Sequence, residues 1–442
     1  MTEIRLLAFE LENGSRRGIF QVLKALMLGL EAEATDQAST DQASTDRPLR
    51  LSLVPPVPGR PFLDPLRDPL ASGGESVTVA TKPPKPLVRR IKAVLLPLDR
   101  LVPLPLSRGL LALALALPAG CWRWLGRWLA RRPSLAYWAL GNTVLASLPV
   151  VASAGRRPGR WTVALSPSLY VPPAGERLAT VIHDLIPLDY PRHHGEEAGE
   201  WQRRLDHSLA CSDLLLAVSE GTADRLRRYR PGCSPRVRVV RPSVSEQGQP
   251  RLQAPPLRST DSLRLCCIGS LEPRKNLHGL LEALALVHRG VIDLDVAGAE
   301  ADEASGYADQ IRARAVEIEE RQGHRLRFHG RVSAERKQAL LAEAHALVYV
   351  PLMEGGALPI LEAQLQGLPT LVSDLAVFRE LVAADRAYFC PPDDPQVMAA
   401  TIERLWDDLL KGVARQPDGD ALAPYASPRR YARALLAALA RG

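Results

Sequence analysis

Features that mark metal sites and disulfide frameworks are scarce in this 442-residue sequence. It has six cysteines and no Cys-x-x-Cys pair, and Cys266 and Cys267 are adjacent in a segment that reads as a buried strand. It also lacks a His-x-x-x-His spacing, an Asp-x-Asp pair at a strand end and a P-loop. This pattern argues against a zinc site and a disulfide framework and is typical of a reducing compartment. We therefore expect neither a bound metal ion nor a cofactor.

Long apolar runs are missing as well. The apolar run at 109–117 is too short to cross a bilayer, which takes about 20 apolar residues. Residues 1–10 carry charges too early for a secretory signal. The expectation that follows is a cytoplasmic protein.

The composition is globular and basic. Hydrophobic residues make up 46% and charged residues 24% of the chain, and a chain of this length is expected to form two domains of Rossmann size. The formal charge of +7 fits nucleic acid, a membrane surface or a phosphorylated substrate as a partner. Because the sequence has no RNP-like signature, no zinc finger and no Lys-rich tail, we do not expect a nucleic-acid partner.

Strands and helices alternate along most of the chain. Residues 6–9 read as a strand, 13–18 as a polar glycine loop and 19–30 as a helix, which together form the opening unit of a doubly wound sheet. In the second half we expect strands at 263–268, 292–297, 325–328, 346–350 and 369–372, and helices at 277–288, 307–322, 334–344, 358–366 and from 395. This alternation predicts an α/β fold with a parallel sheet and helices on both faces.

The same pattern predicts the domain boundaries. We expect an N-terminal Rossmann-like domain over 1–245 with an irregular basic and Pro-rich insertion at 31–160, a linker at 246–261, a C-terminal Rossmann-like domain over 262–425, and a helix at 426–442 that packs back on the N-terminal domain.

A basic turn follows the first strand of the second half. It runs from Gly269 to Leu277, and Arg274 and Lys275 stand beside the start of the next helix. In a parallel sheet this places them at the carboxyl edge, where two cations and free backbone N–H groups can hold a diphosphate. The alternative is a solvated basic turn capped by Asn276, and the spacing alone does not separate the two.

Two carboxylates frame a second loop. Glu354 follows a strand, and Glu362 lies one turn into the helix whose first turn contains Pro359. A carboxylate repels phosphate but accepts hydrogen bonds from sugar or ribose hydroxyls. The alternative is that Glu354 is a surface residue and that Glu362 interacts with the helix dipole.

His183 ends a buried strand of the first half and is followed by Asp184. At the carboxyl edge of an N-terminal sheet it could hydrogen-bond a hydroxyl near a reacting carbon or take part in proton transfer. The alternative is a structural histidine.

Six segments in this order resemble the family-four retaining glycosyltransferases of the GT-B fold, in particular the bacterial mannosyltransferase-like branch. The matching segments are Ser15 to Phe20, His183 to Pro187, Ala217 to Glu220, Gly269 to Leu277, Glu354 to Glu362, and Ser373-Asp374 with Phe378 to Glu380. The resemblance implies two facing Rossmann-like domains with a central cleft. It covers residues 160–440 well, the first 30 residues weakly and residues 31–160 not at all.

The resemblance also implies roles for individual residues. Arg274 and Lys275 match the pair that holds the donor diphosphate, Glu354 the acid beside the transferred sugar, and Glu362 the acid that binds the ribose. His183 matches the N-domain histidine near the sugar. The remaining donor-binding positions are backbone sites at Gly18, Gly269, Gly355, Gly356, Ala357 and Leu358. The implied reaction is retaining transfer of a sugar from a nucleotide-diphosphate sugar to a glycan or lipid-linked acceptor, in polysaccharide or glycolipid synthesis.

The chain departs from the family pattern in one loop. The family has Glu-Gly-Phe-Gly where this chain has Glu354-Gly355-Gly356-Ala357, and glycine there tolerates a positive φ. This departure motivates the rival hypothesis of a non-catalytic protein that binds nucleotide sugars. Other rivals are a nucleotide-sugar epimerase and a basic protein that binds a membrane surface or nucleic acid.

Residues 85–132 combine ten Lys or Arg residues with a cluster of tryptophans and a single Asp. Arg123 and Arg127 are four residues apart, as are Trp124 and Trp128, so on a helix each pair forms a strip. Trp and Arg favour the interface of an anionic membrane, which predicts peripheral contact with its cytoplasmic face. The alternative is that the apolar part of this segment fills the N-domain core.

Overall fold

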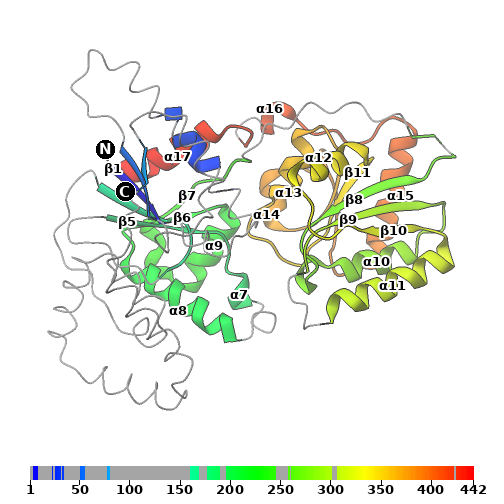
Figure 1. Ribbon diagram of the computed structural model, residues 1–442, viewed down its shortest axis with the longest axis horizontal. Helices are drawn as coiled ribbons and strands as arrows, with labels where there is room; N and C mark the ends of the chain where they lie inside the picture. Colours follow the sequence, from blue (N-terminus) through cyan, green and yellow to red (C-terminus); the bar gives the residue numbers. More distant parts are fainter. Residues whose placement is uncertain are drawn as a thin grey trace. The chain divides into compact units, whose positions relative to one another are not determined.

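Two parallel β-sheets, each with its own helices, organise the part of the chain that the computed structural model describes (Figure 1). The first unit comprises Met1–Val218, Thr222–Ser245 and Pro428–Gly442, and the second comprises Ser219–Gly221 and Glu246–Ser427. The described residues are 3–7, 22, 25–30, 32–33, 50–54, 77–79, 160–168, 177–189, 196–244, 257–258, 260–300, 306–422 and 425–442.

The second unit is built on a six-stranded, fully parallel sheet with the strand order β10-β9-β8-β11-β12-β13. Its strands are β8 (Leu263–Ile268), β9 (Ile292–Ala297), β10 (Arg325–Phe328), β11 (Ala346–Tyr349), β12 (Thr370–Ser373) and β13 (Tyr388–Cys390). The chain adds β9 and β10 on one side of β8 and β11 to β13 on the other, so the strand order reverses between β8 and β11. Loops that follow such a pair lie side by side at the carboxyl edge and form the usual ligand site of an open α/β sheet.

Helices cover both faces of this sheet (Figure 1). One face packs against α10 (Leu277–Ala285), α11 (Tyr307–Gln322) and α15 (Pro395–Leu410), and the other against α12 (Ala334–Glu343), α13 (Leu358–Leu365) and α14 (Ala376–Leu381). Side chains alternate along β8, where Leu263 and Leu265 enter the first core and Cys266 enters the second. The unit is therefore a three-layer α/β/α domain, and it also contains the 3-10 helix η7 (Pro273–Lys275) and α16 (Gly419–Leu422).

The first unit contains a seven-stranded parallel sheet with the order β3-β2-β1-β4-β5-β6-β7. Its strands are β1 (Glu3–Leu7), β2 (Arg50–Val54), β3 (Val77–Val79), β4 (Arg160–Ala164), β5 (Arg177–Ile182), β6 (Leu214–Ala217) and β7 (Val237–Val239). Its helical elements are α7 (Ile186–Asp189), α8 (Glu196–Cys211), most of α9 (Glu220–Tyr229), η6 (Pro231–Arg236) and α17 (Pro428–Arg441). Among the described residues, no helix is both long and apolar enough to span a bilayer.

The C-terminal helix α17 packs within the first unit, against the chain near residue 30. Arg433 donates a hydrogen bond to the Glu33 carboxylate (2.8 Å), and Arg429 donates one to the carbonyl oxygen of Ala32 (3.2 Å). Gly29 permits the close approach, because a Cβ at this position would lie 2.0 Å from the carbonyl oxygen of Pro428. Two arginines and one small residue therefore hold the end of the chain on the first unit.

Every strand and helix expected in the second half is present. The largest difference is in α10, which ends at Ala285 rather than at residue 288. Two elements that were not expected, β13 and α14, are both too short to give a clear periodicity. The expected first strand at 6–9 is wrong: β1 is Glu3–Leu7, a position set by pairing with β2 and β4. The glycine loop at 13–18, with Gly18, and the basic segment at 85–132 lie outside the described residues.

The start of α10 is shaped by Asn276, which has a left-handed backbone (φ 58°). Its side-chain amide donates hydrogen bonds to the carbonyl oxygens of Val350 (3.0 Å) and Pro392 (2.6 Å). Gly279 leaves room for this amide, since a Cβ there would lie 2.5 Å from Asn276 Oδ1. Asn276 therefore ties the basic turn to two loops at the carboxyl edge of the sheet.

We predict that Gly279→Ala destabilises the second unit, although the same change in an unhindered helix stabilises by about 1 kcal/mol. The added methyl group displaces an amide that two hydrogen bonds hold in place, so the free energy of unfolding should fall by about 1–3 kcal/mol. Urea unfolding followed by circular dichroism measures the change.

Gly232→Ala is the matched control, because a Cβ at Gly232 has no neighbour within 4 Å. This variant should be neutral or up to about 1 kcal/mol more stable. A gain of stability in both variants would contradict the packing of Asn276 against α10.

Candidate functional site

The basic turn and the loop after β11 meet at the carboxyl edge of the second sheet. The backbone N–H of Leu352 donates to the carbonyl oxygen of Arg274 (2.8 Å), and Ser373 Oγ donates to the carbonyl oxygen of Pro351 (2.7 Å). The first bond joins the two segments directly, Asn276 adds a side-chain bond between them, and Ser373 anchors the loop to β12. The side chains of Arg274 and Lys275 are therefore presented from a rigid base.

Two cations and two carboxylates form a compact cluster, which we call the four-ion cluster: Glu272, Arg274, Lys275 and Glu354. Arg274 bridges the two acids, with Nη1 2.9 Å from Glu354 Oε1 and Nη2 2.8 Å from Glu272 Oε1. The ammonium group of Lys275 contacts the same Glu354 oxygen. The Arg274, Lys275 and Glu354 side chains are 19%, 15% and 10% exposed. The alternative interpretations of a solvated turn and a surface glutamate are therefore wrong, and Asn276 does not cap α10 with its side chain.

Glu354 is held in its ionised form. Burial alone would raise the pKa of its carboxyl group, but the charges of Lys275 and Arg274 and the hydrogen bonds from Lys275 and Tyr349 outweigh burial, so the pKa lies below its usual value. A depressed pKa means that this carboxylate contributes stability above the pKa of the unfolded chain and that this contribution is lost on acidification. The cluster is therefore charged and paired at neutral pH.

Tyr349, at the end of β11, is a site residue that the sequence analysis missed. Its hydroxyl group accepts a hydrogen bond from Lys275 Nζ (2.7 Å) and donates one to Glu354 Oε1 (2.8 Å). Burial raises the pKa of Tyr349 well above its usual value, so its hydroxyl keeps the proton that it donates. The only signal in the sequence was a polar atom at the end of an apolar strand, and a buried tyrosine hydroxyl usually has a partner.

Glu362, in the second turn of α13, forms an ion pair with Lys337 of α12 (2.7 Å). The side chains of Lys337 and Glu362 are 19% and 16% exposed, so the pair is largely buried. Because α13 has no acidic residue in its first turn, the helix-dipole interpretation of Glu362 is wrong. Lys337 is a second residue that the sequence analysis missed, since its partner lies on another helix.

The loop from Gly355 to Leu358 leads into α13 without a positive φ. Ala357 is buried and has φ −134°, a value that any residue adopts. Gly356 has no positive φ, and a Cβ there would meet nothing within 4 Å. Ala357 thus imposes no backbone strain on the loop. Gly269 begins the basic turn and packs beside the side chains of Lys275 and Tyr349.

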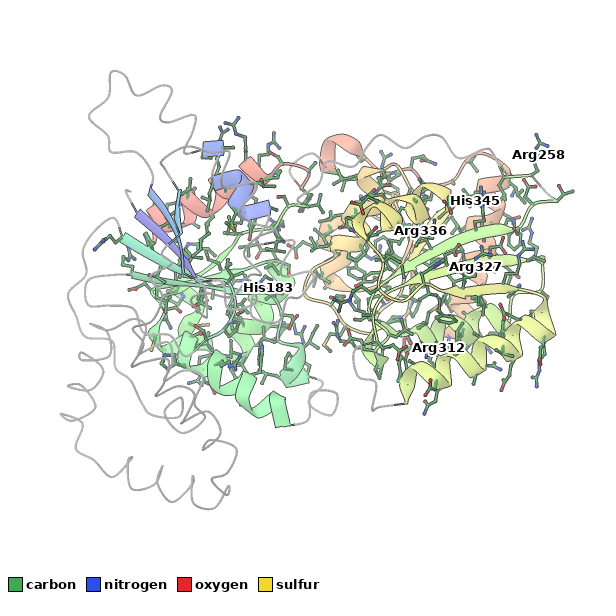
Figure 2. The ribbon with its side chains drawn as sticks, in the orientation of Figure 1. His183, Arg258, Arg312, Arg327, Arg336 and His345 are labelled. Atoms are coloured by element: carbon green, nitrogen blue, oxygen red, sulfur yellow. The ribbon has the colours of Figure 1, made fainter. Side chains whose placement is uncertain are left out.

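His183 belongs to the first unit, where it follows β5 (Figure 2). Its Nε2 lies 2.7 Å from the carbonyl oxygen of Leu165, which follows β4. Because a carbonyl only accepts, Nε2 carries the proton, and Nδ1 is the acceptor in the neutral ring. The carboxylate of Asp184 accepts from the backbone N–H of Ile186 (3.1 Å), which shapes the turn into α7. The imidazole of His183 is thus oriented between the ends of two neighbouring strands.

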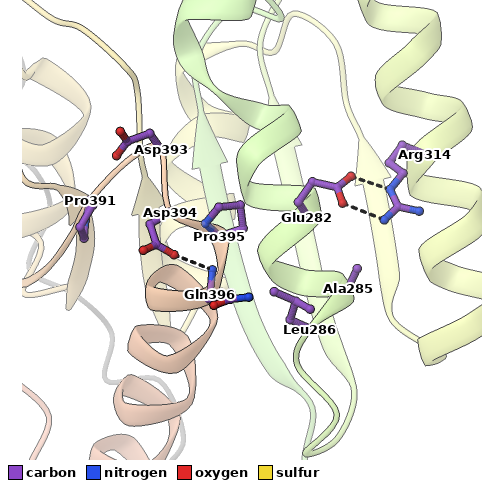
Figure 3. Close-up of a pocket in the computed structure, with 9 residues that line it drawn as sticks. All are labelled: Glu282, Ala285, Leu286, Arg314, Pro391, Asp393, Asp394, Pro395 and Gln396. Carbon is purple, nitrogen blue, oxygen red and sulfur yellow. Dashed lines mark hydrogen bonds and ion pairs between the residues drawn. The ribbon is translucent and has the colours of Figure 1, made fainter.

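A cavity of about 620 Å³ lies elsewhere in the second unit, between α10, α11 and the start of α15 (Figure 3). Three of its charged groups are already paired: Glu282 binds Arg314 through both oxygens (2.7 and 3.0 Å), and Asp394 caps α15. None of the expected site residues lines it. Among the described residues, no group of three or more His, Cys, Asp or Glu side chains is arranged to hold a metal ion.

We predict strong coupling between Lys337 and Glu362. Lys337→Met leaves a largely buried carboxylate without its cation, and Glu362→Gln leaves the ammonium group without its counter-charge. Each change should lower the free energy of unfolding, while the double variant should lose less than the sum, by about 1–3 kcal/mol. A double-mutant cycle by urea unfolding measures this coupling.

The exposed pair Arg227–Asp224 on α9 (2.8 Å; 35% and 58% exposed) is the matched control. Its coupling should be about 0.2–0.5 kcal/mol. Equal coupling in the two pairs would show that Lys337 and Glu362 are solvated rather than held together in the domain.

The family model described as "Glycosyl transferases group 1" matches residues 249–413, which are most of the second unit. O-antigen chain mannosyltransferase B of Escherichia coli is 30% identical over 259 residues, which are 56% of this chain and 66% of that protein. O-antigen chain mannosyltransferase RfbU of Salmonella typhimurium is 24% identical over 237 residues, which are 54% of this chain and 61% of that protein. The chain thus spans less than two thirds of the length of either relative.

Solved structures share the fold over the whole chain. Anabaena Alr3699/HepE, solved in complex with UDP and glucose, has a TM-score of 0.59 at 13% identity, with 100% of both chains covered. The lipopolysaccharide outer core galactosyltransferase WaaB has a TM-score of 0.56 at 13% identity, with 100% of this chain and 99% of that chain covered. At such low identity the likeness shows the fold alone, which is the expected α/β fold with two parallel-sheet domains. Residues 249–413 thus match the group 1 glycosyltransferases, the two parallel-sheet units have the GT-B fold, and the chain is similar to bacterial O-antigen chain mannosyltransferases.

Proposed function

We propose that this chain transfers a hexose from a nucleotide-diphosphate sugar to an acceptor hydroxyl with retention of configuration and without a metal ion. The observation that carries the proposal is the four-ion cluster. It places two cations and a buried carboxylate within hydrogen-bonding distance at the carboxyl edge of a doubly wound sheet. Cations suit a diphosphate, and the carboxylate suits sugar hydroxyls.

Arg274 and Lys275 stabilise the charge that develops on the leaving diphosphate, the role that a metal ion has in other transferases. Among the described residues, Lys275 has two partners for its three ammonium hydrogens, Tyr349 and Glu354, so one donor remains for a phosphate oxygen. The backbone of Gly269 and of the loop Gly355–Leu358 lines the donor, with Glu362 at the ribose.

His183 and Glu354 act at the sugar itself. His183, whose Nε2 donates to the carbonyl oxygen of Leu165, is the residue of the first unit that we place near the reacting carbon. Gly18 lies outside the described residues, and its place beside the phosphates is what the resemblance implies. No side chain at the site is an evident covalent nucleophile, so we favour front-face attack by the acceptor hydroxyl, assisted by the leaving diphosphate.

The related proteins suggest the donor and the pathway. Two of them are mannosyltransferases of O-antigen chains, which makes mannose from GDP-mannose the first candidate and a bacterial polysaccharide or glycolipid the expected product. The rival hypothesis of a non-catalytic protein rested on Ala357. It loses support because Ala357 has an unstrained backbone.

A transfer assay tests the proposal. Purified protein is incubated with GDP-mannose, or with UDP-glucose in parallel, and with a panel of mannose-terminated and lipid-linked acceptors. We expect a glycosylated product that keeps the anomeric configuration of the donor, formed at the same rate with EDTA. Donor binding without transfer across the panel would favour the non-catalytic rival. Loss of turnover in EDTA with recovery in Mg²⁺ or Mn²⁺ would contradict the metal-independent mechanism.

The variant Arg274→Ala/Lys275→Ala belongs in the same experiment. It should weaken nucleoside diphosphate binding by at least ~2 kcal/mol, measured by calorimetry, because two charge-assisted contacts are lost. The control Arg312→Ala/Arg327→Ala removes the same charge from ion pairs elsewhere in this unit (Figure 2) and should leave binding unchanged. Equal losses in both variants would mean that only net charge matters.

We also propose that residues 85–132 bring the enzyme to the cytoplasmic face of the membrane and so to a lipid-linked acceptor. The proposal rests on composition, since this segment lies outside the described residues. Liposome flotation at low salt should recover the protein with anionic vesicles, and less of it after Arg123, Arg127, Arg131 and Arg132 are changed to Ser. Equal recovery in the soluble fraction with and without anionic vesicles would favour the interpretation that the segment fills the N-domain core.

A further inference from the structure

The cations of the four-ion cluster are already paired with carboxylates before any diphosphate binds. Its two cations are matched by two carboxylates, so the cluster is neutral as it stands. A diphosphate competes with Glu354 for Arg274 and Lys275, because both anions attract the same cations, and a full exchange draws the cations away from Glu354. That exchange would leave a carboxylate that is 10% exposed without its cations, and an unpaired buried charge is costly. A third partner is needed to hold Glu354 during the exchange.

Tyr349 is placed to be that partner, because its hydroxyl donates a hydrogen bond to Glu354 Oε1. Three donors converge on Oε1 of Glu354, from Arg274, Lys275 and the Tyr349 hydroxyl. Of these, only the tyrosine is neutral and is not attracted by an arriving phosphate. Its ring is fully packed, lying 5.9 Å from the ring of Phe378, with the Lys275 ammonium 5.2 Å from its centroid. The hydroxyl is therefore fixed in place by the core.

The two oxygens of Glu354 have different surroundings. Every hydrogen bond that Glu354 makes with the described residues goes to Oε1, and Oε2 has no partner among them. A carboxylate held by one oxygen presents the other in a defined direction. Oε2 is thus an acceptor available to a hydroxyl of the bound sugar.

We propose that Tyr349 is a positioning residue of the donor site, which holds Glu354 by Oε1 so that Oε2 receives a sugar hydroxyl while Lys275 and Arg274 turn to the diphosphate. This inference rests on the proposed function and adds a residue to it. Binding of the sugar part of the donor should therefore depend on Tyr349, whereas binding of the diphosphate part should depend on Arg274 and Lys275.

Tyr349→Phe tests the inference, because it keeps the ring and removes the hydroxyl. Calorimetry with GDP-mannose and with GDP alone separates the two parts of the donor, and UDP-glucose with UDP serves if the transfer assay selects that donor. We expect the dissociation constant of the nucleotide sugar to rise about tenfold, and that of the nucleoside diphosphate by less than about threefold. Turnover at saturating donor should also fall.

Tyr388→Phe is the matched control. Tyr388 is a buried tyrosine of β13 in the same unit, and its hydroxyl also donates to a carboxylate, that of Asp408 (2.8 Å). Both variants should lower the melting temperature, and only Tyr349→Phe should change the ratio of the two dissociation constants. If Tyr349→Phe binds the nucleotide sugar as the wild type does, or loses the same factor for both ligands, the positioning role is wrong.

A second readout needs no donor. The groups that face the Glu354 carboxyl are Lys275 and Arg274 from the basic turn and Tyr349 from β11, with Glu272 beyond Arg274. Removing the tyrosine hydroxyl removes a hydrogen bond to the ionised form, so the pKa of Glu354 should rise. Carbon-13 NMR titration of the side-chain carboxyls, with Glu354→Gln to assign the signal, measures it, and an unchanged pKa would overturn the inference.

The two kinds of failure are distinguishable. A wild-type protein that binds no nucleotide sugar contradicts the proposed function, and the NMR titration still decides whether Tyr349 holds the carboxylate. A wild-type protein that binds and transfers, with a Tyr349→Phe variant that matches it, contradicts only the inference about Tyr349.

Discussion

The contact between Glu354 and the pair Arg274 and Lys275 is the interaction on which the rest of the second unit's chemistry depends. Two cations placed side by side in a largely buried turn repel each other, and the shared carboxylate keeps them together. Neighbouring residues hold the turn in this position. Asn276 has a left-handed backbone, and its amide ties the turn to two loops. Gly279 has no side chain that would clash with this amide.

In the function that we propose, the same contact serves a charged and an uncharged part of one ligand. Cations are suited to phosphate oxygens and carboxylates to hydroxyl groups, so a nucleotide sugar needs both within a few ångströms. In the structure, the cations and carboxylates of the four-ion cluster neutralise one another. The hydroxyl of Tyr349 gives the Glu354 carboxylate a neutral hydrogen-bond donor. On the neighbouring helices, Lys337 forms an ion pair with Glu362.

Most of the second unit could be predicted from its sequence. The strand Leu263–Ile268 and the helix Tyr307–Gln322 have the bounds expected from their apolar periodicity, because each is long enough to show one. The three-residue strand β13 and the short helix α14 could not be found in this way. In the first unit the bounds of β1 were predicted wrongly, because they are set by pairing with strands that lie far along the chain.

The sequence by itself determined the alternation of strands and helices, the carboxyl-edge location of Arg274, Lys275 and Glu354, and the resemblance to GT-B glycosyltransferases. These follow from local periodicity and from short motifs whose residues are close in the chain. Only the tertiary structure decided the partners of these groups, Tyr349 for Glu354 and Lys337 for Glu362. The physical reason is that side-chain hydrogen bonds and ion pairs at a sheet edge join different strands, loops and helices, and their geometry is set by packing across the domain rather than by spacing along the chain.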